Sequence, residues 1–333
     1  MSHRTSRATI KDVAREAGVS ISSVSRALNG LTANQELIQR VKIAVELVEY
    51  VPSQLGQSLQ SQRTGQIAIA VPDIANASYL AMLKAAQQIF SEAGYRTTLI
   101  NTGGIPNDDL EIIKGLRQKY VDGLIITSIR PSTELIEEIE ASEVPIVVVG
   151  TIAEAVSFDV VSADSREAAR LAVEHLVSQG CKKIGLIGGP LDTVPGRARY
   201  EGFVEAASKL GVFDENSVVI LKDFQFDLGL VAAKQLIEYG IDGFLGGTDI
   251  LALSILHAAR DAGLSVPLNI RVVGIDNSEA ARLAIPRLTS IDLGAIERGR
   301  LAAEFLVSRL SGFDSAPKVA IVRPRIVVRE SSL

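Results

Sequence analysis

The sequence predicts an α/β protein in which a small helical head precedes a large body of two doubly wound halves, each built on a parallel sheet. Three observations support this prediction. Residues 9–30 encode two short helices with a tight turn between them, and from residue 66 onward short apolar strands alternate with helical stretches. The two halves of this body also echo each other, with Tyr-Val-Asp-Gly-Leu at 120–124 and Gly-Ile-Asp-Gly-Phe at 240–244. At 333 residues the chain has the length for two or three compact units.

The composition indicates a globular protein that is not exported. Hydrophobic residues make up 47 % of the chain and charged residues 22 %, and no apolar run has the length that crosses a bilayer. The first residues are polar and basic, unlike a signal peptide, and the single Cys181 forbids an internal disulfide. We therefore expect a cytoplasmic protein with no membrane partner.

Charge is distributed unevenly along the chain. Residues 1–63 carry eight Lys and Arg against five Asp and Glu, whereas the remainder carries 26 against 34. A basic head on an acidic body points to phosphate contacts from the head, and thus to nucleic acid.

The first two helices carry their own start and stop signals. Thr9 and Asp12 form a capping-box-like pair at the start of the first helix, which ends at Gly18, a residue that adopts the left-handed conformation at no steric cost. Ser20 supplies the cap of a second helix from Ile21 to about Leu28. This arrangement is a helix-turn-helix.

The second helix predicts a DNA-reading face. Val24, Ala27 and Leu28 must face the first helix, which leaves small polar groups and one arginine on the other side. Arginine can pair with guanine through two hydrogen bonds, and seryl groups reach phosphates or base edges. An ordinary surface helix pair is the alternative. The candidate DNA contacts of this motif are Thr9, Ser20, Ile21, Ser22, Ser25, Arg26 and Asn29.

The order of amino acids in residues 9–30 favours the DNA-binding interpretation. Thr-Ile-Lys-Asp-Val-Ala-Arg-Glu-Ala-Gly-Val-Ser at 9–20, followed by Ser-Val-Ser-Arg-Ala-Leu-Asn-Gly at 23–30, closely resembles the headpiece of the lactose-repressor (LacI/GalR-type) family of transcription regulators. The resemblance implies a sequence-specific regulator, expected to act as a repressor, that binds a palindromic double-stranded operator as a homodimer. A tetramer is the alternative assembly.

A third helix and a hinge complete the expected head. Asn34 caps a helix that runs to about Val48, with a buried stripe of Ile38, Val41, Val45 and Val48. The family often has glycine where Glu49 stands, which leaves open how this helix ends.

Residues 53–60 resemble the family's hinge helix. Gly56 and the short length make such a helix unstable alone, so we expect it to fold only on DNA. There the resemblance places Leu59 as a wedge in the minor groove. A disordered linker is the alternative.

In each half of the body we expect four strands that alternate with helices. The expected strands are 67–71, 97–101, 124–127, 146–149, 183–187, 218–221, 244–245 and 271–275. The expected helices are 79–93, 108–120, 133–141, 166–178, 197–210, 228–239, 250–262 and 296–310.

The order of these pieces resembles the family's effector domain, itself similar to periplasmic sugar-binding proteins. Val-Pro-Asp-Ile-Ala-Asn at 71–76, Gly-Arg-Ala-Arg-Tyr-Glu-Gly-Phe at 196–203 and Val-Val-Gly-Ile-Asp at 272–276 are among the matching segments. The resemblance implies a headpiece over 1–50, a hinge over 51–64 and an effector-binding and dimerisation domain over 65–333. Subdomain 1 would comprise about 65–162 and 292–321, and subdomain 2 about 163–291 and 322–333.

Catalytic motifs are missing from the sequence. No nucleotide-binding glycine pattern or nucleophile elbow occurs, and His3, His175 and His257 have no metal-like spacing. Gly188-Gly189-Pro190 fits a sharp turn at a cleft better than a phosphate loop. We expect no enzyme activity, no cofactor and no metal. A solute-binding or sugar-converting protein is the alternative class, but it would lack the headpiece.

Polar and aromatic residues just after the expected strands predict an effector site, because ligands of open α/β folds bind at the carboxyl ends of strands. The resemblance implies that Arg197 and Arg199 point at the effector, that Tyr79 and Phe224 flank it and that Asp276 binds its hydroxyl or amino groups. A helix cap or a solvated charge is the alternative for each residue. The candidates are Asp73, Tyr79, Thr127, Ser128, Arg197, Arg199, Phe224, Thr248, Asp249 and Asp276.

The effector should be a small hydroxylated molecule. A sugar or sugar derivative fits first, with a nucleoside or purine as the alternative, and the regulated genes would form a catabolic or transport operon. Thr248 and Leu293 stand where the family usually has asparagine and glutamine, so no particular sugar carries over. The protein would be cytoplasmic and associated with the nucleoid.

Overall fold

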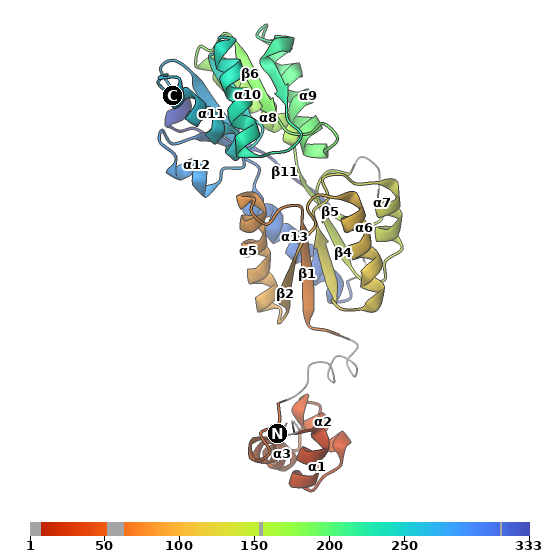
Figure 1. The fold of residues 1–333 in the computed structure, drawn as a ribbon. Coiled ribbons are helices and arrows are strands. Elements are labelled where there is room, and N and C mark those ends of the chain that lie inside the picture. The colour runs from red at the N-terminus through yellow and green to blue at the C-terminus, as the bar shows by residue number, and fades with distance from the viewer. Residues whose placement is uncertain (1–7, 52–62, 153–155, 314) are drawn as a thin grey trace, which may run out of the picture. The chain divides into compact units, whose positions relative to one another are not determined.

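The computed structural model describes residues 8–51, 63–152, 156–313 and 315–333 (Figure 1). The chain forms two compact units, one up to Thr64 and one from Gly65 onward. The expected hinge helix over 53–60, with Leu59, lies outside the described residues.

The first unit is a three-helix headpiece, as the sequence predicts. Its helices are α1 (Ile10–Ala17), α2 (Ile21–Leu28) and α3 (Gln35–Leu47). The Asp12 carboxylate accepts hydrogen bonds from the Thr9 backbone N–H (2.9 Å) and Oγ1 (2.7 Å), and Gly18 ends α1 at φ 63°. The Ser20 side chain accepts from the backbone N–H of Ser23 and caps α2.

The headpiece core differs in one detail from the expected stripe. Val13, Val24 and Val41 are its fully buried members, and the partly buried Val45 and Val48 pack against them. Ile38 does not join this core, whereas Ala44 does.

Helix α3 ends in a left-handed residue that is not glycine. Glu49 has φ 52°, the Tyr50 N–H donates to the Val45 carbonyl (3.0 Å), and the Glu49 N–H donates to the Glu46 carbonyl (3.3 Å). These two bonds form a Schellman cap, a motif that favours glycine at the left-handed position. The helix therefore ends as it would with glycine, and Glu49 carries the backbone strain.

The larger unit contains two six-stranded sheets. The first has the strand order β11-β5-β4-β3-β1-β2, and all its pairs are parallel. Its strands are β1 (Gln66–Val71), β2 (Arg96–Asn101), β3 (Gly123–Ile126), β4 (Ile146–Val149), β5 (Asp159–Ala163) and β11 (Val319–Val322).

The second sheet has the order β12-β10-β9-β8-β6-β7 and is parallel except at its edge, where β12 runs antiparallel to β10. Its strands are β6 (Ile184–Gly188), β7 (Val218–Ile220), β8 (Gly243–Gly246), β9 (Arg271–Ile275), β10 (Thr289–Asp292) and β12 (Arg325–Val327). The chain passes between the sheets after β5, after β10 and between β11 and β12.

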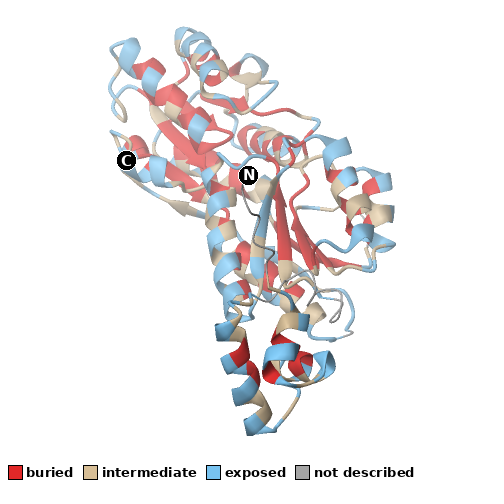
Figure 2. Cartoon of the chain, turned by 60° about the horizontal axis from the view of Figure 1, so that its bottom comes forward, coloured by how far each residue is buried: buried red, intermediate tan, exposed pale blue. Residues whose placement is uncertain are grey.

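Helices cover both faces of each sheet, and the central strands form a buried middle layer (Figure 2). On the first sheet, α5 (Ala77–Glu92) and α13 (Ala295–Leu310) share one face, and α6 (Pro106–Gly115) and α7 (Thr133–Glu140) cover the other. The second sheet carries α8 (Ser165–Ser178) and α9 (Val194–Lys209) on one face, and α10 (Phe226–Glu238) and α11 (Asp249–Asp261) on the other. A short α12 (Glu279–Leu283) follows β9.

Glycines let one helix pair in each half approach closely. A Cβ added at Gly299 of α13 would lie 2.2 Å from the Met82 carbonyl oxygen of α5. A Cβ added at Gly202 of α9 would lie 2.2 Å from the Arg166 carbonyl oxygen of α8. Both distances are far below a van der Waals contact, so these two crossings require glycine.

The strain at Glu49 generates a prediction. Replacing Glu49 by glycine relieves about 1–2 kcal/mol of left-handed strain, which the greater unfolded-chain entropy of glycine offsets by about 0.5–1 kcal/mol. We expect Glu49→Gly to stabilise the headpiece by about 0.5–1 kcal/mol, measured as slower amide hydrogen exchange in α3 of the full chain. The control Glu46→Gly, inside α3, should speed exchange, since helix-interior glycine costs about 1 kcal/mol. Faster exchange in Glu49→Gly would contradict the prediction.

Candidate ligand cavity and nucleic-acid interface

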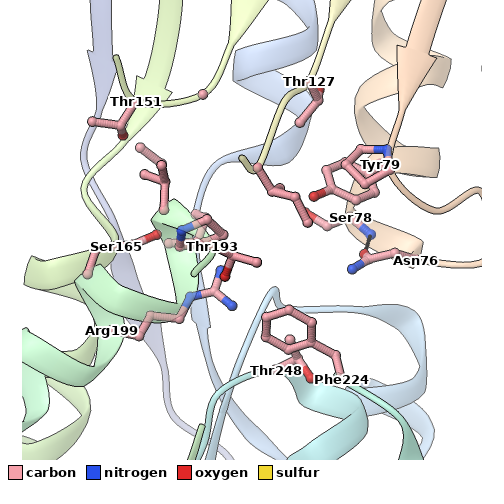
Figure 3. A pocket seen from close by; sticks show the side chains of 18 of the residues that line it. Asn76, Ser78, Tyr79, Thr127, Thr151, Ser165, Thr193, Arg199, Phe224 and Thr248 are labelled. Atoms are coloured by element: carbon pink, nitrogen blue, oxygen red, sulfur yellow. Dashed lines mark hydrogen bonds between the residues drawn. The ribbon is translucent and has the colours of Figure 1, made fainter. Parts of the chain in front are cut away.

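A cavity of about 690 Å³ lies between the two sheets of the larger unit. Its wall consists mainly of residues that follow the carboxyl ends of strands from both sheets, together with the first turns of several helices (Figure 3). Thr127 and Thr151 come from the first sheet's side, and Thr193, Phe224 and Thr248 come from the second. This is the edge at which the sequence places a ligand.

Eight of the ten expected effector residues line this cavity. Whether they bind a ligand stays a prediction. The eight are Asp73, Tyr79, Thr127, Ser128, Arg199, Phe224, Thr248 and Asp276.

Arg197 and Asp249 are not among the lining residues, and the sequence prediction was wrong to place them there. Arg197 is exposed, and its Nε donates to the Leu191 carbonyl (3.1 Å), because residues two apart on a helix face different directions. Asp249 is 1 % exposed and accepts from Ser290 Oγ (2.6 Å) and the Ser278 N–H (2.7 Å). It ties the start of α11 to β10 and to the residue that caps α12.

Arg199 reaches the cavity from the first turns of α9. The Thr193 side chain caps this helix, and Figure 3 shows Arg199 reaching towards Thr193 and Phe224. Arg199 is 7 % exposed, and its Nη1 donates to the Gly247 carbonyl (2.6 Å), whereas its Nε has no hydrogen-bond partner in the described part of the chain. One edge of the guanidinium is thus anchored to the loop after β8.

Phe224 lies over the turn that follows β6. A Cβ at Gly189 would lie 2.0 Å from the Phe224 ring, so glycine is needed there for the ring to fit. Gly188 is the last residue of β6, and a turn follows only at Pro190, whose carbonyl accepts from the Thr193 N–H (3.2 Å). The Gly188-Gly189-Pro190 segment therefore leaves the strand beside an aromatic wall, and the sharp turn that the sequence predicts begins at its last residue.

Asp276 is a strained, partly buried acid that follows the end of β9. Its φ is 118°, and its backbone N–H donates to the Ile291 carbonyl (2.9 Å). Burial is the main cause that raises the pKa of the Asp276 carboxyl to about 7. Arg199 and Arg298 lower this pKa, and Asp249 raises it. Desolvation outweighs the two arginines, so this carboxyl exchanges its proton near neutral pH.

Tyr79 faces the same group of charges from α5. Burial, followed by the nearby Asp276, raises the pKa of its hydroxyl to about 12. The hydroxyl therefore stays protonated and can donate a hydrogen bond to a ligand.

The sequence analysis missed Arg298, which lines the cavity from α13. Burial lowers the pKa of its guanidinium, an effect that Tyr79 and Asp276 partly offset. Arg298 belongs to the buried stripe of α13 with Ala295, Gly299 and Ala302. An arginine at helical spacing within a stripe of small apolar residues is a signal that could have found it. Other polar lining residues that were not expected include Asn76, Ser78, Arg130, Thr151, Asp164, Arg166, Thr193 and Lys222.

In the headpiece, most of the expected DNA contacts lie on the surface. Residues Thr9, Ser20, Ile21, Ser22, Arg26 and Asn29 are exposed. Ser25 was expected on this face and is instead 9 % exposed, with the Asn29 Nδ2 donating to its Oγ (3.4 Å). It follows Val24 on the inner side of α2, and a serine is small enough to pack there. Leu59 lies outside the described residues.

The described part of the chain has neither a metal-binding cluster nor a membrane-spanning helix. No group of three or more His, Cys, Asp or Glu side chains could hold a metal ion there. None of the described helices has both the length and the apolar character to cross a membrane.

Comparisons with protein families place both units. Residues 9–53 match the model of bacterial regulatory proteins of the lacI family, and residues 173–332 match a periplasmic binding protein-like domain. The ribose operon repressor of Halalkalibacterium halodurans is 30 % identical over 97 % of both chains. The catabolite control protein A of Priestia megaterium is 30 % identical over 97 % of this chain and 99 % of its own. The repressor PurR of Vibrio atlanticus is 30 % identical over 97 % and 98 %.

Solved structures agree with this placement. The complex of the transcriptional regulator CelR with cellobiose has a TM-score of 0.73 and 28 % identity over 98 % of this chain and all of its own. The lac repressor dimer bound to operator and the anti-inducer ONPF has a TM-score of 0.86 over the same shares, and at 24 % identity it supports the fold alone.

The pKa of Asp276 generates a prediction for the ligand-free protein. An unfolded aspartate has a pKa near 3.9, so between about pH 4 and pH 7 the native chain holds a proton that the unfolded chain has released. The free energy of unfolding should therefore fall as pH rises through this window. Asp276→Asn should remove this contribution and gain roughly 1–3 kcal/mol above pH 7, measured by denaturant unfolding from pH 4 to 8.

The exposed Asp73, across the cavity, supplies the control for this experiment. Asp73→Asn removes one carboxyl from the exposed side of the cavity, so it separates the effect of net charge from the effect of the Asp276 position. Parallel profiles for the parent and Asp276→Asn would show that Asp276 ionises as an ordinary carboxyl.

Proposed function

We infer, from the fact that this chain belongs to the lacI family of bacterial regulatory proteins, that its headpiece reads operator DNA and its larger unit binds a small effector. Members of this family are DNA-binding transcription regulators, and the chain is one of them rather than an enzyme. The observation that carries the proposal is the exposed polar face of α2 within a capped helix-turn-helix. The proposed boundaries are a headpiece over 1–50, a hinge over 51–64 and an effector and dimerisation domain over 65–333.

On DNA, α2 would lie in the major groove as the recognition helix. Ile21 is 45 % exposed on the polar face of α2, and contact with a thymine methyl group would bury it. Arg26 stands on the same side with its guanidinium exposed and could pair with guanine. Ser25 is not proposed as a base contact because it is buried.

The protein would bind as a dimer to a palindromic operator. One headpiece with one short recognition helix offers few contacts, so two copies on two half-sites are needed for tight binding. The protein would act in the cytoplasm and, when bound to DNA, at the nucleoid.

The effector would be a sugar or a sugar derivative. Hydroxyl, carboxyl and guanidinium groups together with the aromatic rings of Tyr79 and Phe224 suit a polyol. Relatives named for the ribose operon and a solved complex with cellobiose support a carbohydrate, and regulation of a catabolic or transport operon follows from it. A purine is the second candidate, because Phe224 could stack on a base and one relative is named PurR.

Effector binding would act through the two halves of the larger unit. Tyr79 and Thr127 belong to the first half and Arg199 and Asp276 to the second, so a ligand that contacts all four favours one arrangement of the halves. A ligand shifts such an equilibrium only by its difference in affinity for the two arrangements, and allosteric couplings are typically about 1–3 kcal/mol.

Selection of bound fragments from random DNA tests the proposed function. The full chain should enrich an approximately palindromic sequence, and an asymmetric half-site would contradict dimeric binding. On the selected operator, Arg26→Ala should cost about 1–3 kcal/mol and relax the preference at one base position.

Lys42 supplies the control, because it is exposed on α3, away from the proposed reading face. Lys42→Ala should keep the ratio of operator to random-DNA affinity. If Arg26→Ala weakened binding to operator and random DNA equally, Arg26 would be a phosphate contact instead of a base contact.

A further inference from the structure

Arg298 is a buried cation with no partner of its own. It is 9 % exposed and lines the cavity, and among the described residues its guanidinium makes no recorded hydrogen bond or ion pair. Its Nε is fully buried and lacks an acceptor. A buried charge without a partner destabilises a fold by several kcal/mol, so a residue of this kind needs an explanation.

The neighbouring acids do not neutralise Arg298. Asp276 acts on both Arg298 and Arg199, so one carboxyl faces two buried guanidinium groups. Asp292 also acts on Arg298, but its carboxylate already accepts from Arg325 Nη2 (2.9 Å) and the Gly294 N–H (2.8 Å). Tyr79, which also faces Arg298, is neutral near pH 7 because its pKa is raised to about 12. The wall around these side chains therefore carries surplus positive charge.

Helix amino termini add to this surplus. Asn76, Thr193 and Thr248 cap α5, α9 and α11, and all three caps line the cavity. Each helix presents the positive end of its dipole at its amino terminus, which favours a negative group nearby. Together with Arg298 and Arg199 they make a pocket wall that is complementary to an anion.

Hydroxyl chemistry is present in the same wall. Thr127 is buried, and its Oγ1 has no hydrogen-bond partner in the described chain. The hydroxyl can donate and accept, and so matches a ligand hydroxyl. The wall thus offers partners both for an anionic group and for a polyol.

We propose that the effector is a hydroxylated molecule with an anionic group, a carboxylate or a phosphate, which Arg298 and Arg199 bind together. The proposal rests on the proposed function, because it specifies the ligand class of the same cavity. A neutral sugar would offer the two guanidinium groups only dipolar oxygens, whereas an ionised acceptor forms hydrogen bonds about twice as strong. The planar fork of arginine donors also fits the paired oxygens of carboxylates and phosphates.

Matched sets of ligands test this class. Isothermal titration of the full chain would compare glucose, gluconate and glucose 6-phosphate, and ribose with ribose 5-phosphate. At least one charged member should bind more than tenfold more tightly than its neutral parent. A preference for gluconate identifies the group as a carboxylate, and a preference for a sugar phosphate identifies it as a phosphate.

Inorganic phosphate and acetate make the test independent of the sugar. At constant ionic strength, one of these anions should raise the unfolding temperature of the parent relative to chloride. The same anion should give little or no rise in Arg298→Met, which keeps the length of the side chain and removes its charge. Equal shifts in the parent and Arg298→Met would overturn the proposal.

Arg298→Met also separates ligand binding from a structural role. Without ligand, this variant should unfold at a temperature at least as high as the parent, because it removes an unpaired buried charge. With the preferred charged ligand, it should lose at least tenfold in affinity. A lower unfolding temperature with undiminished anion affinity would assign Arg298 to the structure and refute the proposal.

The matched control is Arg300→Met on the same helix. Arg300 is half-exposed, does not line the cavity and pairs with Glu297 (2.6 Å) and Glu304 (2.5 Å), so its loss should leave anion affinity unchanged. An equal loss in Arg300→Met would mean that general charge, and not the cavity, attracts the anion.

The proposed function and this inference fail in different ways. If only neutral sugars bind, and Arg298→Met does not affect them, the effector is uncharged and the regulator function stands. If the parent selects no operator from random DNA, the regulator function fails whatever the cavity binds.

Discussion

The close contact of α13 with α5 is the constraint on which the cavity depends. The chain leaves the second sheet after β10, and α13 then packs on the first sheet beside α5, at a distance that only Gly299 permits. Arg298 precedes this glycine, so the same contact brings its guanidinium near Tyr79. Gly202 allows the corresponding approach of α9 to α8 in the second half, three residues after Arg199. Each half therefore contributes one buried arginine to the cavity, from a helix whose position depends on a close contact at a glycine.

The sequence predicted those parts of the fold whose signals are local. The caps at Thr9 and Ser20 and the left-handed Gly18 lie within the segments that they shape, and the headpiece helices match the prediction. Strands β5, β10, β11 and β12 were missed, because they are short or carry polar residues, and in β11 and β12 no residue is fully buried. Their positions depend on pairing with strands far away in the chain, as β11 with β5. The hydrophobic periodicity within a short segment does not indicate which distant strand it pairs with.

The site was predictable to the extent that it follows strand ends. Thr127, Thr248 and Asp276 come directly after strands or within a few residues of them, and the open α/β architecture alone assigns them to one edge. Arg197 was wrongly included among the cavity residues because the sequence predicts the helix but not which of its side chains face the cavity. Arg298 was missed because α13 reaches the cavity through tertiary packing. Ser25 shows the same limit in the headpiece, where a small polar residue fits an inner position as well as an outer one.

Strand β1 connects the cavity to the segment that leads to the headpiece. It begins after Gly65, whose N–H donates to the Asp122 carboxylate (2.9 Å), and ends next to Pro72 and Asp73 in the cavity wall. Between these ends it is buried and paired with β2 on one side and β3 on the other, so a change of its register would break both ladders. We therefore expect a signal from the cavity to move the first half as a rigid body. Such a movement has a defined effect on DNA only relative to a second copy of the chain, which is why effector control and dimeric operator binding belong together in the proposed function.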